Sequence, residues 1–372
     1  MNASLGFLGD AFLYALRGYT MTIIEQYNLT LQIEVLKEQS AETLARLCKL
    51  VDESGSSDCV EALKAYSHIV NTELYLATSI HDLEVLKSDM VKLENNIKES
   101  LEQASQGVKD YKTTSDVQDM ESYSSEDFDK ALERTIDLLT VNKNISSTPH
   151  AVILGGQSGA GKTTIHRVKM IESQGDYIVI DGDTYRAQHP HFRELQEKYG
   201  VDSVDYTKMF AGKMVEAVID KLSSLHYNLI IEGTLRSATV PITTATLLKS
   251  KGYAVDFCLI ATKPELSYLT TQLRYLEMLV VDPLQARATP KEHHDGIVKS
   301  LISNSNELEQ SGLFESVQVY KRDLEQVYNS KLCTESVGTV VDRILFGAWT
   351  QDEVDLLNFG KAQELELQKQ LC

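Results

Sequence analysis

The sequence predicts an α/β domain, with a parallel sheet flanked by helices, preceded by an all-α helical bundle domain. Residues 20–100 carry apolar side chains at three- and four-residue steps, which is typical of amphipathic helices. Residues 102–126 are polar and rich in serine, as in a solvated linker. After this segment, short apolar runs alternate with helical patterns, which indicates a parallel sheet covered on both faces.

Length and charge limit the classes of protein to consider. The chain has 372 residues, of which 42% are hydrophobic, so it has room for two domains with cores of their own. Its 36 Lys and Arg against 54 Asp and Glu give a net charge of −18. Such a charge repels the phosphate backbone of nucleic acids, and we therefore expect no DNA partner.

The cysteines and the first residues indicate the compartment. Five cysteines are scattered without a CxxC spacing, so we expect reduced thiols rather than disulfides or a zinc site. The first residues lack a basic stretch and include Asp10, unlike a signal peptide, and no apolar run has the length of a membrane span. We expect a cytoplasmic protein without a membrane partner.

The first half of the chain reads as helix almost throughout. Apolar residues recur at helical steps from Leu44 to Val51, small and turn-forming residues interrupt the pattern at 53–58, and a helix pair follows from 60 to about 101. The absence of proline from this half favours a small bundle. The resulting boundaries are 1–101 for the bundle, 102–126 for the linker and 127–372 for the α/β domain with a C-terminal helix.

The second half opens with a helix that contains Phe128 and Leu132, and strands follow it. Each expected strand is an apolar run rich in β-branched residues, and a helical pattern separates it from the next. The expected strands are residues 151–156, 177–181, 228–233 and 255–262.

A phosphate-binding motif is the strongest local signal. Residues 156–163 read GQSGAGKT, a full GxxxxGK[ST] match between an expected strand and an expected helix. Backbone N–H groups of such a loop surround phosphate oxygens, Lys162 reaches the β- and γ-phosphates, and the Thr163 hydroxyl ligates Mg²⁺. An incidental glycine-rich turn is the alternative, which the strand–loop–helix context disfavours. The expected nucleotide-binding residues are Gly156, Gln157, Ser158, Gly159, Ala160, Gly161, Lys162, Thr163 and Thr164.

Two carboxylates follow the second expected strand. Asp181 and Asp183 come directly after it, at the carboxyl edge of a parallel sheet, where open α/β folds bind their ligands. Phosphoryl transfer needs a group that orients the acceptor hydroxyl and takes its proton, which an aspartate facing the γ-phosphate supplies. Either aspartate alone is equally compatible with a helix cap, and the two can divide these roles.

Further polar residues belong to the same edge. Glu232, Thr234 and Arg236 follow the third expected strand. Arg274 and Arg287 can clamp the transferring phosphoryl group, whose charge develops on its oxygens, although each alone is compatible with a surface ion pair. We expect no metal site beyond nucleotide-bound Mg²⁺.

Most of the chain resembles a known family. From about Ser124 to Trp349 it resembles the zeta toxins, the kinase toxins of bacterial epsilon/zeta toxin–antitoxin systems, of the pneumococcal type. The motifs that carry the resemblance stand in the family order: LGGQSGAGKTTIHR, IDGDTYRAQHP, YTKMFAGKMVE, YNLIIEGTLR, IATKPELSYL and QARATPKEHHD. Residues from about 26 to 100 resemble the helical, toxin-neutralising part of the partner antitoxin, so an antitoxin-like domain is fused to a toxin.

The resemblance implies an activity, namely transfer of the γ-phosphate of ATP or GTP to the 3′-hydroxyl of the amino sugar of UDP-N-acetylglucosamine. This reaction withdraws a precursor from peptidoglycan synthesis. By motif match, Asp183 is the catalytic base, Lys162 and Thr163 serve the nucleotide and its Mg²⁺, and Arg274 and Arg287 stabilise phosphate. The positions that line the sugar-nucleotide pocket are Glu216, Glu232, Thr234, Arg236 and Thr244.

The resemblance also implies an intramolecular inhibitor. In the family the antitoxin helices lie over the nucleotide site, so we expect the first half to obstruct the phosphate loop, in one chain or between the two chains of a homodimer. Only about 25 residues precede the neutralising helices, where relatives carry a DNA-binding repressor domain. An aromatic and apolar stretch there is a candidate lid, with packing inside the bundle as the alternative: Phe7, Phe12, Leu13, Tyr14, Leu16 and Tyr19.

Two other functions fit the residues. The first is a metabolic P-loop kinase of another small molecule, with a helical dimerisation domain. The second is a nucleotide-dependent switch whose helical half is the effector and whose hydrolysis times its release. Residue patterns alone support a P-loop phosphotransferase, and the acceptor rests on the resemblance.

Overall fold

The computed structural model describes residues 21–54, 59–105, 121–283 and 286–371. The candidate lid from Phe7 to Tyr19 lies outside the described residues.

The N-terminal part is a helical bundle, as predicted. Its elements are α2 (Ile23–Ser54), α3 (Val60–His68), the π-helix η1 (Ile69–Glu73), α4 (Leu74–Leu76) and α5 (Ile80–Ser105). The expected break at 53–58 separates α2 from α3. Leu44, Leu47 and Val51 of α2 face a shared apolar core with Leu63 of α3 and Met90 of α5. The helical periodicity in the sequence therefore corresponds to the buried stripe of each helix.

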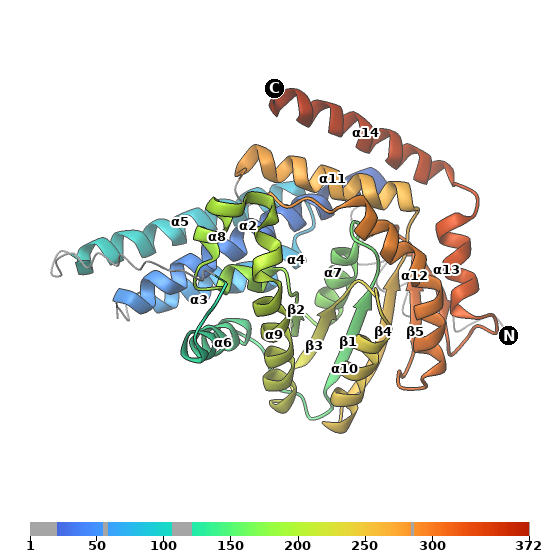
Figure 1. The fold of residues 1–372 in the computed structure, drawn as a ribbon, viewed down its shortest axis with the longest axis horizontal. Coiled ribbons are helices and arrows are strands. Elements are labelled where there is room, and N and C mark those ends of the chain that lie inside the picture. Colours follow the sequence, from blue (N-terminus) through green and yellow to red (C-terminus); the bar gives the residue numbers. More distant parts are fainter. Residues whose placement is uncertain (1–20, 55–58, 106–120, 284–285, 372) are drawn as a thin grey trace.

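The C-terminal part is a six-stranded sheet with helices on both faces (Figure 1). Its strands are β1 (His150–Gly155), β2 (Tyr177–Ile180), β3 (Asn228–Glu232), β4 (Ala254–Ile260), β5 (Val317–Tyr320) and β6 (Gln326–Asn329), in the order β2-β3-β1-β4-β5-β6. Its helical elements are α6 (Ser125–Leu139), α7 (Lys162–Glu172), η2 (Thr184–Gln188), α8 (Phe192–Tyr199), η3 (Gly200–Asp202), α9 (Ser203–Ser224), α10 (Thr239–Ser250), α11 (Pro264–Val281), α12 (Lys291–Gln310), α13 (Val337–Phe346) and α14 (Gln351–Leu371). No helix among the described residues combines the length and apolarity that crossing a bilayer requires.

The four expected strands are present and parallel, which confirms the predicted sheet. The sequence did not reveal β5 and β6, each of four residues, of which β6 pairs antiparallel to β5 at the sheet edge. Both contain glutamine, Gln318 in β5 and Gln326 in β6, so neither reads as a continuous apolar run.

Alternation along the strands divides the sheet into two faces. Ile153 of β1 and Phe257 of β4 belong to the larger core, which α6, α9, α10, α12 and α13 cover. Val152 and Leu154 belong to a second core under α7, which Tyr75 of the N-terminal bundle completes. The bundle therefore packs against the same face of the sheet as the helix that follows the phosphate-binding motif.

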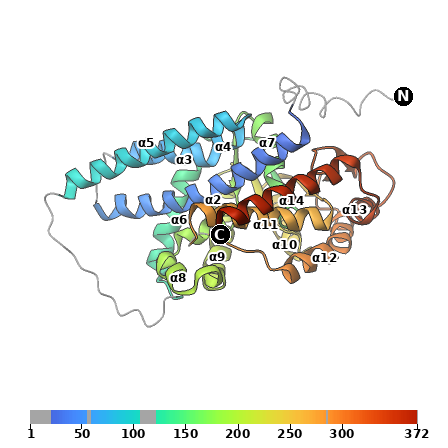
Figure 2. The same cartoon turned by 90° about the horizontal axis from the view of Figure 1, so that it is seen from above.

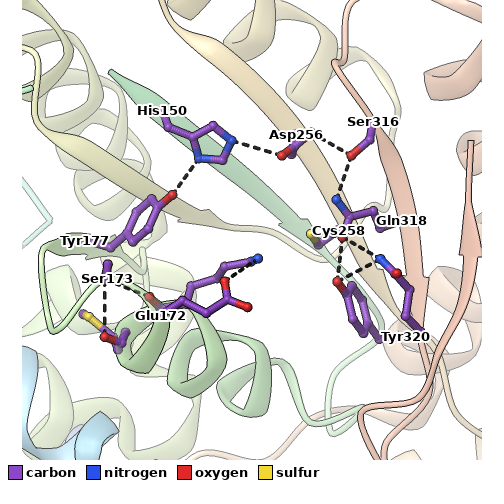
Figure 3. A network of polar contacts seen from close by, with 12 residues as sticks. His150, Glu172, Ser173, Tyr177, Asp256, Cys258, Ser316, Gln318 and Tyr320 are labelled. Carbon is purple, nitrogen blue, oxygen red and sulfur yellow. Dashed lines mark hydrogen bonds and ion pairs between the residues drawn. The ribbon is translucent and has the colours of Figure 1, made fainter. Parts of the chain in front are cut away.

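A polar network lies on the face of the sheet that packs against α7 and reaches β4 and β5 (Figure 3). His150 lies 2.6 Å from the Tyr177 hydroxyl and 3.0 Å from the Asp256 carboxylate. Ser316 donates to Asp256, and Gln318 donates to Ser316, both at 2.7 Å. These polar side chains satisfy one another's hydrogen bonds across four strands, so this part of the face is polar.

The linker between the two parts is shorter than the sequence indicated. α5 extends to Ser105, beyond the boundary at residue 101, and α6 begins at Ser125, within the range assigned to the linker. Ser124 caps α6 through a capping box with Asp127. The ring of Tyr123 packs against Phe210 of α9 at 5.0 Å, so the C-terminal part begins before Tyr123.

The N-terminal bundle lies along the helices next to the sheet. Figure 2 shows α2 beside α11 and α14. Tyr27, Leu31 and Val35 of α2 share an apolar cluster with Leu269 of α11 and Leu356 of α14. This cluster fixes the position of α2 over the carboxyl edge of the sheet.

Loss of the α6 cap tests the revised boundary. In a chain of residues 121–372, Ser124→Ala is expected to lower the free energy of unfolding by about 1 kcal/mol, because the side chain of Ser124 accepts a hydrogen bond from the backbone N–H of Asp127. Urea denaturation followed by circular dichroism measures this difference. Ser125→Ala, at the exposed first position of the helix, is the matched control and should change stability by less. Equal effects of the two substitutions would indicate that the Ser124 cap does not stabilise this domain and that the domain starts after it.

Candidate functional site

The phosphate loop, residues 156–161, connects β1 to α7. Gly159 has φ +73° and Gly161 has φ +100°, which L-residues rarely adopt. A Cβ on Gly159 would lie 2.1 Å from the carbonyl oxygen of Ser267, so the loop passes α11 too closely for a side chain. The glycines of the motif are therefore required by the local geometry.

The first turn of α7 holds the lysine and the hydroxyl groups of the phosphate-binding motif. Lys162, Thr163 and Thr164 are all buried at this helix N-terminus. The Lys162 ammonium lies 3.4 Å from the Gly156 carbonyl oxygen and 3.5 Å from a carboxylate oxygen of Glu232. Backbone N–H groups at a helix start attract anions, so this turn suits phosphate oxygens, and Thr163 stands where a hydroxyl can ligate the accompanying Mg²⁺.

A series of buried, hydrogen-bonded polar side chains supports the phosphate loop. The Gln157 side chain donates to the Thr262 carbonyl oxygen at 2.7 Å and lies 3.4 Å from the Ser267 hydroxyl. Ser267 is in turn 2.8 Å from Nε2 of the fully buried His294. The Gln157 side chain therefore helps to position the loop, and its contact with the nucleotide stays a prediction. The sequence analysis did not single out Ser267 or His294.

Asp181 and Asp183 lie at the carboxyl end of β2, as predicted. Asp183 is exposed, and its carboxylate accepts a hydrogen bond from Arg186 at 2.9 Å. Desolvation raises the pKa of this carboxyl, but the positive charges of Arg287 and Arg186 outweigh it and hold the pKa below its ordinary value. An ionised, accessible carboxylate at this edge is chemically able to accept a proton from an acceptor hydroxyl.

Glu232 ends β3 between Lys162 and His166. Its second carboxylate oxygen lies 3.2 Å from Nε2 of His166. Burial, followed by the negative charge of Asp181, raises the pKa of Glu232 to about 7. Burial also lowers the pKa of His166 well below its ordinary value, so the ring is neutral at pH 7.

The remaining positions of the sugar-nucleotide pocket are less closely grouped. Thr234 and Arg236 lie in the loop after β3, on either side of the buried Leu235, which has φ +57°. Glu216 is exposed on α9, and the Thr244 hydroxyl donates to the Val240 carbonyl oxygen within α10. The structure joins Glu232 to the phosphate loop directly, whereas the roles of Glu216, Thr234, Arg236 and Thr244 stay predictions.

Residues 133–332 match the family described as Zeta toxin, which is more than half of the chain. The chain belongs to the zeta toxin family. Residues 25–100 match the family described as Bacterial epsilon antitoxin, so the second element of the resemblance is confirmed as well.

Individual relatives agree with this membership. Toxin PezT of Streptococcus pneumoniae serotype 4 is 55% identical over 249 residues, which cover 67% of this chain and 98% of that protein. Toxin zeta of Streptococcus agalactiae is 41% identical over 208 residues, covering 56% of this chain and 72% of that protein. A solved structure from the PezAT toxin–antitoxin system of Streptococcus pneumoniae has a TM-score of 0.63 and 50% identity, and the match covers 68% of this chain and 99% of that one. The match thus covers nearly the whole of Toxin PezT and of the solved chain.

The antitoxin-like helix α2 contacts both arginines of the zeta toxin site. Glu38 lies 2.8 Å from Arg287 and 3.4 Å from Arg274, so one carboxylate joins the two guanidinium groups. Glu34 lies 3.9 Å from Arg274. The structure therefore brings Arg274 and Arg287 together, as predicted for a phosphate clamp, with a carboxylate of the antitoxin-like helices between them.

The same helix contacts the aspartate that ends β2. The Lys37 ammonium lies 2.6 Å from a carboxylate oxygen of Asp181, and Lys37 is itself buried. Desolvation opposes ionisation of Asp181, but the charge of Lys37 prevails and holds the pKa of Asp181 well below its ordinary value. Tyr75 of α4 packs edge-on against His166 at 5.6 Å. The antitoxin-like part therefore covers the site on the side of Asp181 and α7.

Sequence reasoning missed the residues that link the two parts. Lys37 and Glu38 stand on a helix surface that is rich in charges, and nothing local separates them from solvated neighbours. His166 follows the phosphate motif, but a histidine on a helix has no distinctive spacing. The available signal was position: both Lys37 and Glu38 lie within the segment that resembles neutralising antitoxin helices.

The raised pKa of Glu232 predicts a pH dependence of stability. Its folded-state pKa of about 7 lies above the ordinary value of 4.5, so ionisation of Glu232 opposes folding. Relative to Glu232→Gln, the unmodified chain should lose stability as the pH rises from 4.5 to 7, on the order of 1 to 3 kcal/mol, and change no further above this range. Urea denaturation at pH 5 and pH 8 measures this difference.

The matched control is Glu265→Gln, on the exposed side of α11. Its stability difference from the unmodified chain should not follow the same pH course. A Glu232→Gln difference that stays constant between pH 5 and pH 8 would contradict the shifted pKa.

Proposed function

We propose that the chain is a toxin kinase that transfers the γ-phosphate of ATP or GTP to the 3′-hydroxyl of the amino sugar of UDP-N-acetylglucosamine. We further propose that its antitoxin-like helices hold it inactive. The observation that carries the proposal is the convergence of a phosphate loop, an ionised aspartate and a pair of arginines at one sheet edge, in a member of the zeta toxin family. Its relatives are named toxins, which favours a phosphorylation that harms the cell over a step of metabolism, and the acceptor itself rests on the motif resemblance.

The residues divide the work of phosphoryl transfer. The loop N–H groups and Lys162 would hold the β- and γ-phosphates, and the Thr163 hydroxyl would hold Mg²⁺, which would supply charge neutralisation to the nucleotide. Arg274 and Arg287 stabilise the charge that develops on the transferring group. Asp183 accepts the proton of the attacking hydroxyl and orients it.

The acceptor belongs on the β3 side of the loop. Glu232 reaches Lys162 there, and Thr234 and Arg236 follow in the same loop. A hydrogen-bonding edge of this kind suits a sugar with several hydroxyls and a diphosphate. Glu216 and Thr244, on α9 and α10, complete the proposed pocket.

The proposed inhibition acts through ion pairs between α2 and the charged groups of the site. Glu38 engages both arginines, and Lys37 engages Asp181, so these groups cannot serve a phosphoryl group while α2 is docked. Release of α2, in the chain or by exchange with another chain, is then the step that activates the kinase.

Phosphate transfer measured by mass spectrometry tests both halves of the proposal. ATP with Mg²⁺ and UDP-N-acetylglucosamine are incubated with the full chain, with residues 121–372, and with the latter carrying Asp183→Asn. Only the unmodified fragment is expected to form phosphorylated sugar nucleotide rapidly, because Asp183→Asn removes the proton acceptor and lowers the rate roughly 10²- to 10⁴-fold.

Asp205→Asn, on the exposed surface of α9, is the control for that substitution and should keep full activity. ATP binding without any phosphorylated sugar nucleotide would reject the proposed acceptor. A full chain as active as the fragment would reject the inhibition.

Charge reversal at Glu38 tests the inhibition within the full chain. Glu38→Arg places a third cation beside Arg274 and Arg287, and like charges in contact cost several kcal/mol, so α2 should undock. We expect the full chain to gain at least roughly tenfold in phosphate transfer. Glu84→Arg, a reversal at a glutamate whose side chain is 72% exposed, is the control and should leave the full chain inactive. An equally inactive Glu38→Arg chain would show that docking does not depend on this carboxylate.

A further inference from the structure

Arg322 occupies a position over the phosphate loop that the proposed mechanism does not use. It lies in the turn after β5, where Leu324 N–H donates to the Lys321 carbonyl oxygen at 3.0 Å. Its Nη1 donates to the Gly159 carbonyl oxygen and to the Thr270 hydroxyl, both at 3.0 Å. One edge of the guanidinium is therefore anchored to the loop and to α11.

The sheet order places Arg322 opposite the reacting groups. β1, which leads into the loop, lies between β3 and β4. Asp183 and Glu232 follow β2 and β3 on one side of the loop, whereas Arg322 follows β5 on the other side. A triphosphate that crosses the loop with its γ-phosphate near Asp183 therefore has its nucleoside on the side of Arg322.

An aromatic ring of the antitoxin-like part covers this guanidinium. The centroid of the Tyr27 ring lies 4.5 Å from the guanidinium carbon of Arg322. The Tyr27 hydroxyl lies 3.3 Å from the Thr270 hydroxyl, and the ring of Phe359 in α14 meets Tyr27 edge-on at 6.3 Å. The slot around Tyr27 is thus lined by a planar cation, an aromatic edge and one hydroxyl.

Arg322 also differs from the other arginines of the site in its partners. Arg274 and Arg287 each face the carboxylate of Glu38. Within the part of the chain that the structure describes, no carboxylate lies within 4.0 Å of the Arg322 guanidinium, whose polar contacts are those with Gly159 and Thr270. A guanidinium without a counter-ion, one face of which lies against an aromatic ring, is suited to stacking on a π system.

We infer that Arg322 is the stacking platform for the purine base of the nucleoside triphosphate, and that Tyr27 fills the place of the base while α2 is docked. The inference rests on the proposed function, because the base belongs to its phosphate donor. The Thr270 hydroxyl, which meets the Tyr27 hydroxyl in the docked state, is then available to a polar edge of the nucleoside. α2 thereby blocks both ends of the nucleotide, with Glu38 at the phosphates and Tyr27 at the base.

Comparison of two ligands separates a base contact from support of the loop. Isothermal titration calorimetry on residues 121–372 gives the dissociation constants of ATP and of inorganic tripolyphosphate, which has no base, both with Mg²⁺. This fragment contains the whole of the larger core, and its counterpart makes up nearly the whole of Toxin PezT. Arg322→Ala removes the guanidinium, and Arg322→Lys keeps the charge but removes the plane.

We expect both substitutions to weaken ATP binding roughly tenfold and to leave tripolyphosphate binding nearly unchanged. Arg343→Ala and Arg343→Lys, at an arginine whose side chain is 62% exposed on α13, are the matched controls and should weaken neither ligand. Equal weakening of both ligands by Arg322→Lys would overturn the inference, because Arg322 would then act only through the loop. Unchanged ATP binding would overturn it as well.

The outcome also distinguishes this inference from the proposed function. If ATP binds and UDP-N-acetylglucosamine is phosphorylated at the usual rate in Arg322→Ala at saturating ATP, the function stands and the change lies in nucleotide affinity alone. That split, a raised KM for ATP with an unchanged kcat, supports the stacking role. A fragment that binds neither ATP nor tripolyphosphate would reject the function and the inference together.

Discussion

The bridge of Glu38 to two arginines is the interaction around which the molecule is organised. Arg274 and Arg287 both lie against Glu38, and two neighbouring guanidinium groups repel each other without an anion between them. A carboxylate on α2 supplies that anion. The charge pattern that suits a phosphate therefore also suits a glutamate, and the requirements of the site create the docking surface for the helix that covers it.

Support of the phosphate loop depends on buried neighbours. His294 is buried and hydrogen-bonded to Ser267, which borders the loop through Gln157. A loop of glycines has little packing of its own, so its position depends on such neighbours. The helix that carries Ser267 also carries Arg274, and thus one element, α11, positions both the loop and half of the clamp.

Whether the sequence predicted a feature depends on how far apart along the chain its interacting residues lie. The loop was predictable because its requirements are local: glycines at positive φ, then a lysine at a helix start. Asp183 was predictable because the ends of parallel strands share one edge. The pairs Lys37–Asp181 and Glu38–Arg287 join residues 144 and 249 positions apart, and no spacing within the chain encodes them. Strands β5 and β6 were not predicted for a different reason, since their polar residues interrupt the apolar pattern.

The composition of the α2 contact determines how firmly the proposed inhibitor can hold. Buried ion pairs roughly break even, because desolvation of the charges offsets most of their attraction. The net attraction then comes mainly from the apolar side chains Tyr27, Leu31 and Val35 against α11 and α14. A tethered helix faces its site at an effective concentration on the order of millimolar, so such a modest contact suffices to keep it docked. The charged residues contribute selectivity instead, because Lys37 and Glu38 match the charges of Asp181, Arg274 and Arg287.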